Sequence, residues 1–94
     1  MNIKPSGWYV YMLRCNDDSL YAGITIDLVR RLKEHNYGAK GARYTRARRP
    51  VQLVYQEAAA SRSDAAKREY QLKKMSPGQK RLLVQRYDND RMRK

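Results

Sequence analysis

The pattern of apolar and polar positions predicts a β-hairpin near the start of the chain. Residues 8–15 alternate, with Trp8, Val10 and Met12 on one face and the residues between them on the other. The turn-forming run NDDS separates this segment from a second apolar segment, residues 20–25. Gly23 interrupts that second strand, which is typical of a bulge or of another group lying close to the backbone.

The rest of the chain is expected to add three helices and one strand. Asp27 is a suitable N-cap for a helix over residues 28–35, in which two leucines four residues apart share a face. Residues 51–56 have the composition of a third strand, and residues 61–75 that of a second helix.

A third helix should begin at Pro77, because Ser76 and Gln79 have the spacing of a capping box and proline suits the first helical position. We expect it to end at about Arg86. The predicted order β-β-α-β-α-α indicates an α+β fold, a small three-stranded sheet flanked by helices. The chain is interpreted as one domain over residues 1–94, with a core of about 8–86 and a loose basic tail over 87–94.

The excess of basic residues indicates the class of binding partner. The 94 residues contain 21 Lys and Arg against 9 Asp and Glu, a formal net charge of +12, so a polyanion is the expected partner. No apolar run approaches the length that spans a bilayer, and residues 1–7 lack the apolar core of a signal peptide, so we expect no membrane partner. The single cysteine, Cys15, fits a core position and a cytoplasmic protein.

Residues 37–50 are rich in glycine and arginine and are predicted to be a loop. A run of charge is usually a solvated surface, but here a tyrosine lies among the arginines, an arrangement that suits contact with a phosphate backbone and stacking on bases. The candidate nucleic-acid-binding residues are Lys40, Arg43, Tyr44, Arg46, Arg48 and Arg49.

Three polar residues fall on or beside apolar helix faces. Arg31 and His35 are four apart, so they share a face of the first helix beside its leucines. A lone histidine at a helix end more often interacts with the helix dipole than with a substrate. Glu69 lies on the apolar stripe of the second helix, where a carboxylate needs a partner. That partner is either a metal ion or a basic residue, Arg31 or Lys73.

The order and spacing of these residues resemble the GIY-YIG nuclease domain, and most closely its small stand-alone bacterial branch. The resemblance runs from Trp8 to about Leu83. It rests on Tyr9-Val10-Tyr11, Tyr21-Ala22-Gly23, Arg31, His35 and Glu69. Tyr9-Val10 replaces the family's first Gly-Ile, and Ala22 its second Ile. Several members of the family also use a C-terminal asparagine. In this chain the corresponding candidate, Asn89, lies in the expected tail and is not assigned to the site.

The resemblance implies an endonuclease that hydrolyses DNA phosphodiester bonds. Because no second domain is expected to read sequence, we expect selectivity for branched, nicked or single-stranded DNA, in repair or recombination. It implies that Tyr11 activates the attacking water, that Tyr21 holds water and phosphate, and that Arg31 binds the scissile phosphate. His35 would move a proton or position a tyrosine, Glu69 would hold one Mg²⁺ or Mn²⁺ ion, and Gly23 would leave space beside Tyr21.

Two alternatives remain at this point. A catalytically silent nucleic-acid-binding module of the same fold would explain the charge without chemistry, and a basic scaffold or ribosome-associated protein would need no metal. DNA is the expected partner, although the residues themselves do not separate it from RNA. A monomer or weak dimer is expected.

Overall fold

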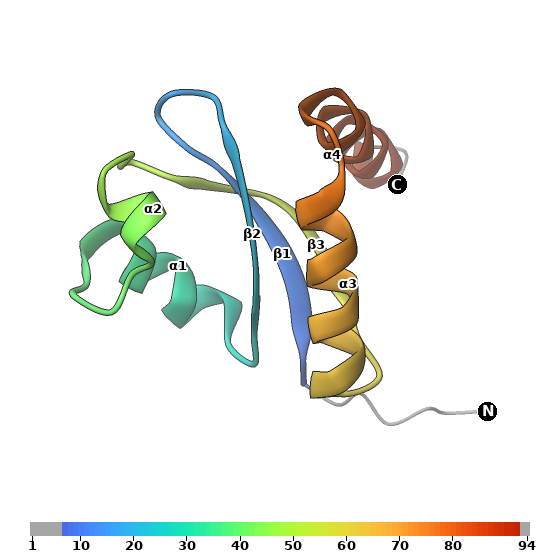
Figure 1. The fold of residues 1–94 in the computed structure, drawn as a ribbon, viewed down its shortest axis with the longest axis horizontal. Coiled ribbons are helices and arrows are strands. Elements are labelled where there is room, and N and C mark those ends of the chain that lie inside the picture. Colours follow the sequence, from blue (N-terminus) through green and yellow to red (C-terminus); the bar gives the residue numbers. More distant parts are fainter. Residues whose placement is uncertain (1–6, 93–94) are drawn as a thin grey trace.

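The computed structural model describes residues 7–92 as a three-stranded antiparallel sheet with helices on both faces (Figure 1). The predicted α+β fold is confirmed, with one short helix added. The elements in chain order are β1 (Tyr9–Arg14), β2 (Leu20–Thr25), α1 (Leu28–Tyr37), α2 (Arg43–Arg46), β3 (Gln52–Ala58), α3 (Arg62–Lys74) and α4 (Pro77–Met92).

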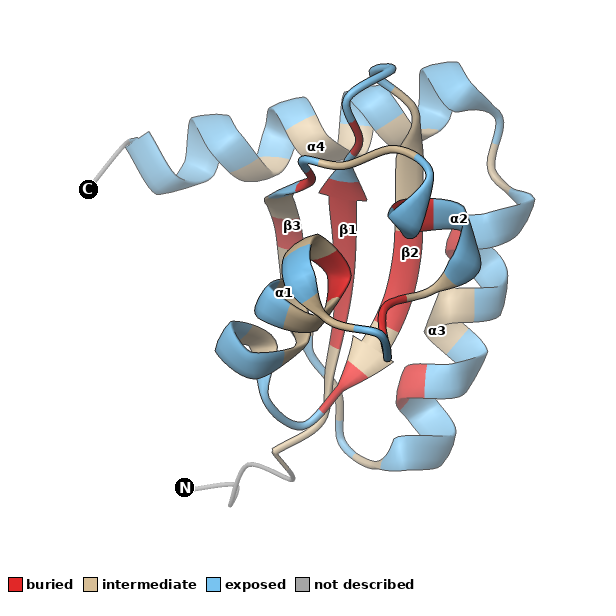
Figure 2. Cartoon of the chain, turned by 90° about the vertical axis from the view of Figure 1, so that its left-hand side faces the viewer, coloured by how far each residue is buried: buried red, intermediate tan, exposed pale blue. Residues whose placement is uncertain are grey.

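β1 is the central strand of the sheet, whose order is β2-β1-β3. The predicted hairpin pairs β1 with β2 so that Tyr11 lies opposite Gly23. β3 pairs with the other edge of β1, with a register shift between Met12 and Leu13. Tyr11 therefore belongs to the middle of the sheet, whereas β2 forms an exposed edge beside α2 and α3 (Figure 2).

The two faces of the sheet pack against different helices, and the alternation in β1 divides its side chains between them (Figure 2). Val10 and Met12 face α3 and α4, where Leu72 is fully buried. The opposite face carries a second cluster, packed against leucines of α1, whose buried members are Tyr11, Leu13, Cys15 and Val51. The expectation that Cys15 is a core residue is confirmed.

The predicted helix starts are also confirmed. The Asp27 carboxylate accepts a hydrogen bond from the Arg30 backbone N–H and begins α1. Ser76 and Gln79 form the expected capping box through reciprocal hydrogen bonds of 3.2 and 2.9 Å. Such caps satisfy backbone donors that have no partner inside the helix.

The end of the last helix differs from the prediction, because α4 continues to Met92 instead of stopping at about Arg86. The expected loose tail is therefore helical as far as the structure describes it. Two contacts support this extension: the Tyr87 ring lies 5.2 Å from that of Tyr55, and Arg91 is paired with Asp88 at 2.9 Å. Asn89 is exposed on α4.

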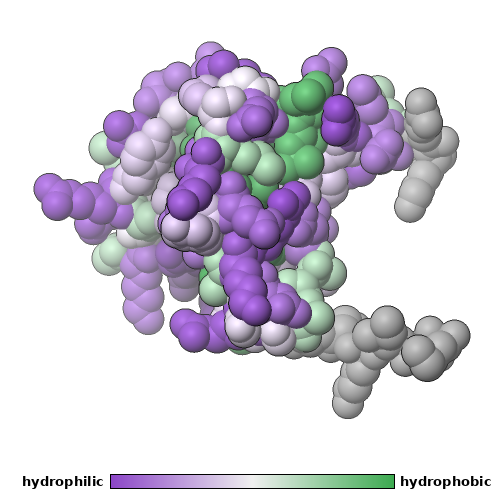
Figure 3. Space-filling view, turned by 45° about the vertical axis from the view of Figure 1, so that its right-hand side comes forward, coloured by the Kyte–Doolittle hydropathy of each residue, from purple (hydrophilic) through white to green (hydrophobic). Residues whose placement is uncertain are grey.

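Hydrophilic side chains cover most of the face shown in Figure 3, with a smaller hydrophobic area between them. Several large apolar side chains are exposed, among them Tyr70 and Leu82. No helix within residues 7–92 combines the length and apolar character needed to cross a bilayer.

Candidate active site

Tyr11 and Tyr21 of the hairpin meet the only histidine of the chain on the α1 side of the sheet. The Tyr11 hydroxyl lies 2.7 Å from Nε2 of His35, in a hydrogen bond between buried groups. The Tyr21 ring packs edge-on against the same imidazole, with ring centroids 5.4 Å apart. α1 supplies the histidine from its last turns, so the helix and the hairpin together enclose the imidazole.

Gly23 is required by the close approach of Tyr11. The Tyr11 ring lies across its β2 partner, and a Cβ at position 23 would stand only 2.6 Å from Cζ of Tyr11 and in collision with its hydroxyl. The prediction of a close approach at this glycine is confirmed. The space left by the missing side chain, however, is filled by Tyr11 and is not left open beside Tyr21.

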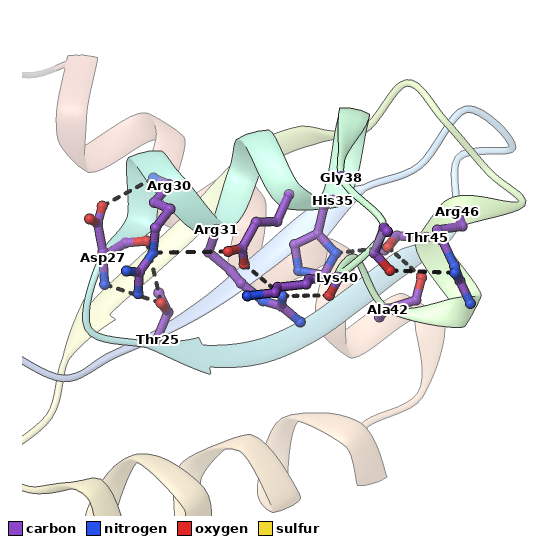
Figure 4. A network of polar contacts seen from close by, with 12 residues as sticks. Thr25, Asp27, Arg30, Arg31, His35, Gly38, Lys40, Ala42, Thr45 and Arg46 are labelled. Atoms are coloured by element: carbon purple, nitrogen blue, oxygen red, sulfur yellow. Dashed lines mark hydrogen bonds and ion pairs between the residues drawn. The ribbon is translucent and has the colours of Figure 1, made fainter.

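The imidazole of His35 is held from both sides. Its Nδ1 lies 2.7 Å from Oγ1 of Thr45, which in turn donates to the Ala42 carbonyl at 2.9 Å (Figure 4). His35 and Thr45 are fully buried, and no buried side-chain nitrogen or oxygen within residues 7–92 lacks a hydrogen-bond partner. The side chains of Tyr11, His35 and Thr45 therefore form one continuous hydrogen-bonded chain.

Burial sets the protonation of this chain. Burial raises the pKa of Tyr11 to about 12, against the opposing effect of the neighbouring Arg31 guanidinium. Burial also lowers the pKa of His35 to about 4, and the positive charges of Arg31 and Arg49 act in the same direction. Both groups are therefore neutral around pH 7, and the hydrogen bond between them joins a phenol to a neutral imidazole.

Arg31 lies at the rim of this cluster, with about a quarter of its side chain exposed. Nη1 of Arg31 donates to Oε1 of Glu34 and to the Lys40 carbonyl, both at 2.9 Å (Figure 4). The guanidinium also acts on the Tyr11 hydroxyl, which raises the pKa of Arg31 despite its partial burial. Arg31 is thus a fixed positive charge beside the tyrosine.

Glu69 approaches from α3, on the same helix face as the buried Ala65 and Leu72. Its carboxylate pairs with Nζ of Lys73 at 3.4 Å, and this ammonium lies 5.8 Å from the centroid of the Tyr21 ring. Of the two basic partners considered for Glu69, Lys73 is the one found, whereas Arg31 pairs with Glu34. The charge of Glu69 also reaches Tyr11 and contributes to raising its pKa.

The donor set at Glu69 is small. Within residues 7–92 no three His, Cys, Asp or Glu side chains lie together as a metal-binding group. A single carboxylate suits Mg²⁺ or Mn²⁺ better than a transition metal held by several side chains, because Mg²⁺ keeps most of its waters and takes few protein ligands. The chemistry of this one hard oxygen ligand fits the divalent ion expected from the sequence.

The segment predicted as a loop contains the short helix α2, and part of its charge is used inside the molecule. Arg49 donates to three main-chain carbonyls at the end of α1, those of Glu34, His35 and Gly38. Arg48 pairs with Asp17 at 3.0 Å and lies 3.8 Å above the centroid of the Tyr44 ring. These two arginines brace the site through contacts within the protein, and their contact with a nucleic acid stays a prediction.

The remaining members of the basic segment face outward. Lys40, Arg43 and Arg46 are exposed, and the Arg46 guanidinium donates a long hydrogen bond of 3.5 Å to the Ala39 carbonyl. Tyr44 stacks on Tyr21, with centroids 5.9 Å apart and an interplanar angle of 22°. This stacking joins the basic segment directly to the tyrosines of the hairpin.

Thr45 is the site residue that sequence reasoning missed. It lies in the middle of RYTRARR, where a helix of four residues is too short to show a helical period and the arginines dominate the pattern. No signal in the chain marked it as buried. Lys73, by contrast, was one of the two basic partners expected for Glu69.

Comparison with known proteins identifies the family of the chain. The model of the family described as the GIY-YIG catalytic domain matches residues 7–81. The UPF0213 protein DP2720 of Desulfotalea psychrophila is 58% identical over 77 residues, 82% of this chain and 70% of that protein. The UPF0213 protein of Syntrophus aciditrophicus is 51% identical over 76 residues, 81% of this chain and 87% of that protein.

A solved structure supports the same relationship. The solution NMR structure of the UPF0213 protein BH0048 from Bacillus halodurans is 45% identical to this chain and superposes with a TM-score of 0.53. The likeness covers 83% of this chain and 82% of that one. The chain therefore belongs to the GIY-YIG family, among the small bacterial UPF0213 proteins.

Proposed function

We propose that the protein is a divalent-metal-dependent endonuclease that hydrolyses phosphodiester bonds in DNA. The observation that carries this proposal is the buried hydrogen bond between Tyr11 and His35, placed beside the Arg31 guanidinium and within the electrostatic reach of Glu69. Membership of a family defined by a catalytic domain supports it. Phosphodiester hydrolysis needs an oriented water, a cation on the phosphoryl oxygens and help for the leaving alkoxide.

Arg31 is the group we assign to the scissile phosphate. A guanidinium can grip two phosphoryl oxygens at once, and its hydrogen bonds to Glu34 and Lys40 hold it in place. Because those bonds already fix the side chain, little conformational entropy remains to be lost when a phosphate binds.

Tyr11 is the group we assign to the attacking water. Its pKa of about 12 keeps it a phenol at neutral pH, so its first task is to orient the water through an oxygen lone pair. Its conversion to the phenolate needs more positive charge than Arg31 alone supplies. The phenol is hydrogen-bonded to His35, and the Tyr21 ring packs against the same imidazole.

Glu69 is the residue that would hold the divalent ion, in place of its ion pair with Lys73. The ion, when bound, supplies Lewis acidity to the phosphate and stabilises the leaving alkoxide. Lys40, Arg43 and Arg46 are positioned to contact the flanking phosphates, which would give affinity without reading sequence. We further propose that the protein acts in the cytoplasm as a monomer or weak dimer, on branched or single-stranded DNA in repair or recombination.

The test is a cleavage assay on plasmid, single-stranded, flap and four-way-junction DNA, with a single-stranded RNA for comparison. Wild type, Glu69→Gln and Asp90→Asn are purified identically and assayed with Mg²⁺, Mn²⁺ or EDTA. Asp90 is an exposed acid on α4, so Asp90→Asn is a control that removes the same charge away from the site. We expect metal-dependent products from wild type and the control, and none from Glu69→Gln.

The other outcomes are equally informative. Equal cutting by Glu69→Gln would assign the activity to a contaminant. Binding to every substrate without cutting would replace the proposal with the silent binding module of the same fold. Cutting of RNA in preference to DNA would keep the chemistry and change the substrate.

A further inference from the structure

The direction of the hydrogen bonds through His35 can be deduced from Thr45. We propose that Thr45 is a positioning residue that fixes the tautomer of His35 and so makes Tyr11 donate its proton inward. This inference rests on the proposed nuclease function for its consequence, although the hydrogen-bond direction itself is independent of it. The Thr45 hydroxyl is hydrogen-bonded to the imidazole and to the Ala42 carbonyl, so its effect on Tyr11 passes through His35.

The argument starts at the far end of the chain. A threonine hydroxyl has a single hydrogen, and the Ala42 carbonyl 2.9 Å away can only accept it. With that hydrogen committed, Oγ1 can only accept in its second contact, the one at 2.7 Å to His35. Nδ1 of His35 must therefore carry a hydrogen.

The rest follows from the neutral imidazole. A neutral histidine carries one ring hydrogen, so a protonated Nδ1 leaves Nε2 with a free lone pair. The low pKa of His35 supports the neutral form. Nε2 then accepts at 2.7 Å from the Tyr11 hydroxyl, whose hydrogen points into the protein. The lone pairs of the phenol oxygen that remain are the ones available to a water.

The opposite tautomer would reverse this arrangement. If Nε2 carried the hydrogen, it would donate to the Tyr11 oxygen, and the phenol hydrogen would have to turn elsewhere. A water would then meet a donor in place of an acceptor, which is the wrong polarity for a group that orients a nucleophile. The Thr45 hydroxyl thus selects the tautomer in which the Tyr11 oxygen can accept from a water, although Thr45 is separated from Tyr11 by the imidazole.

The local fold explains why Thr45 can hold this role. Ala42 is the N-cap of α2, and its carbonyl also accepts the Arg46 backbone N–H at 3.0 Å. Thr45 sits three residues further along the same turn with its side chain fully buried. The carbonyl is therefore fixed in place by the helix, and the hydroxyl has no alternative solvent partner.

The experiment compares wild type with Thr45→Val, which keeps the shape and removes the hydroxyl, and Thr45→Ser, which keeps the hydroxyl. The first readout is ¹⁵N NMR of the His35 imidazole at neutral pH without DNA, which distinguishes the two tautomers. The chain has no other histidine, so the ring signals need no assignment. The second readout is single-turnover cleavage at saturating DNA.

We expect the Nδ1–H tautomer in wild type and Thr45→Ser, and its loss or a mixture in Thr45→Val. Cleavage by Thr45→Val should fall by about 100-fold or more, a typical effect of disturbing a proton-transfer group, with rescue in Thr45→Ser. If the role of Thr45 were purely structural, Thr45→Val would leave the His35 tautomer unchanged, and the two variants would cleave at the same rate.

Two results would overturn the inference: an Nε2–H tautomer in wild type, or a Thr45→Val variant that retains both the tautomer and the cleavage rate. If Thr45→Val does not fold, the wild-type tautomer and the behaviour of Thr45→Ser still decide. If wild type cleaves nothing yet shows the Nδ1–H tautomer, the proposed function fails while the assigned hydrogen-bond direction stands.

Discussion

Titration of His35 is expected to make the free energy of unfolding depend on pH between its folded and unfolded pKa values. The imidazole is fully buried between two hydroxyl groups, and its pKa is lowered to about 4 from an ordinary value of 6.5. The unfolded chain binds a proton at this residue at a higher pH than the folded chain does. Protonation therefore favours unfolding, and the stability present above about pH 6.5 is lost as the pH falls towards 4.

The size of the effect follows from the two pKa values. Each unit of difference between the folded and unfolded pKa of His35 corresponds to about 1.4 kcal/mol of stability. The full loss, reached below the folded pKa, is therefore roughly 3 kcal/mol. Between about pH 7 and about pH 5 the expected loss is about 2 kcal/mol. Asp17 and Glu34 have lowered pKa values, so their contributions change only in more acid solution.

The assay is urea denaturation followed by circular dichroism at several pH values across this window. Wild type is compared with His35→Gln, which has no group that titrates there, and an NMR titration of the ring gives the folded-state pKa directly. We expect wild type to lose stability on acidification and the slope to vanish in His35→Gln. A flat wild-type profile, or the same slope in both proteins, would refute the reasoning.

Three further substitutions test the packing around the site, each measured by urea denaturation. Gly23→Ala should destabilise the fold by about 1–3 kcal/mol through overpacking against Tyr11, whereas Gly78→Ala, with nothing nearer than 4.0 Å, should not; equal effects would argue against the close approach. Leu72→Ala should cost roughly 2–5 kcal/mol by opening a cavity between α3 and the sheet, and a value below about 1 kcal/mol would contradict its full burial. Arg49→Lys should cost roughly 1–3 kcal/mol, because an ammonium cannot reproduce the fork that reaches three carbonyls; an unchanged midpoint would show that these bonds contribute little.

The sheet and its helices were predictable because their signals are local. Alternation in β1 assigned Val10 and Met12 to one face and Tyr11 to the other, and side-chain caps marked where helices begin. The end of α4 was missed because charged residues were interpreted as a frayed tail. No Gly or Pro interrupts the chain after Gly78, so nothing there requires the helix to stop.

The site was predictable in its members and less so in their connections. The spacing of Arg31 and His35 brought both to one helix face, and the resemblance to a family added the tyrosines and Glu69. The contact between His35 and Thr45 joins two segments through a four-residue helix, so no periodic pattern carries it. Arg31 pairs with Glu34, three residues further along α1, and Glu69 pairs with Lys73, four residues further along α3. Both pairs have the spacing of neighbours on one helix face, and the interpretation that offered Arg31 to Glu69 overlooked the local partner Glu34.

The bracing arginines also change how the charge of this protein should be counted. The basic segment contributes five cations, but Arg48 and Arg49 are already committed to Asp17 and to the end of α1. Lys40, Arg43 and Arg46 are the exposed cations of the segment, and each one that neutralises a phosphate adds about 0.7–0.9 to the slope of log affinity against log salt. The segment should therefore account for a slope of about 2–3, where a count of its letters would give about 4. Salt that weakens binding would at the same time weaken the exposed Arg48–Asp17 pair, so ionic strength acts on the surface and on the brace behind it together.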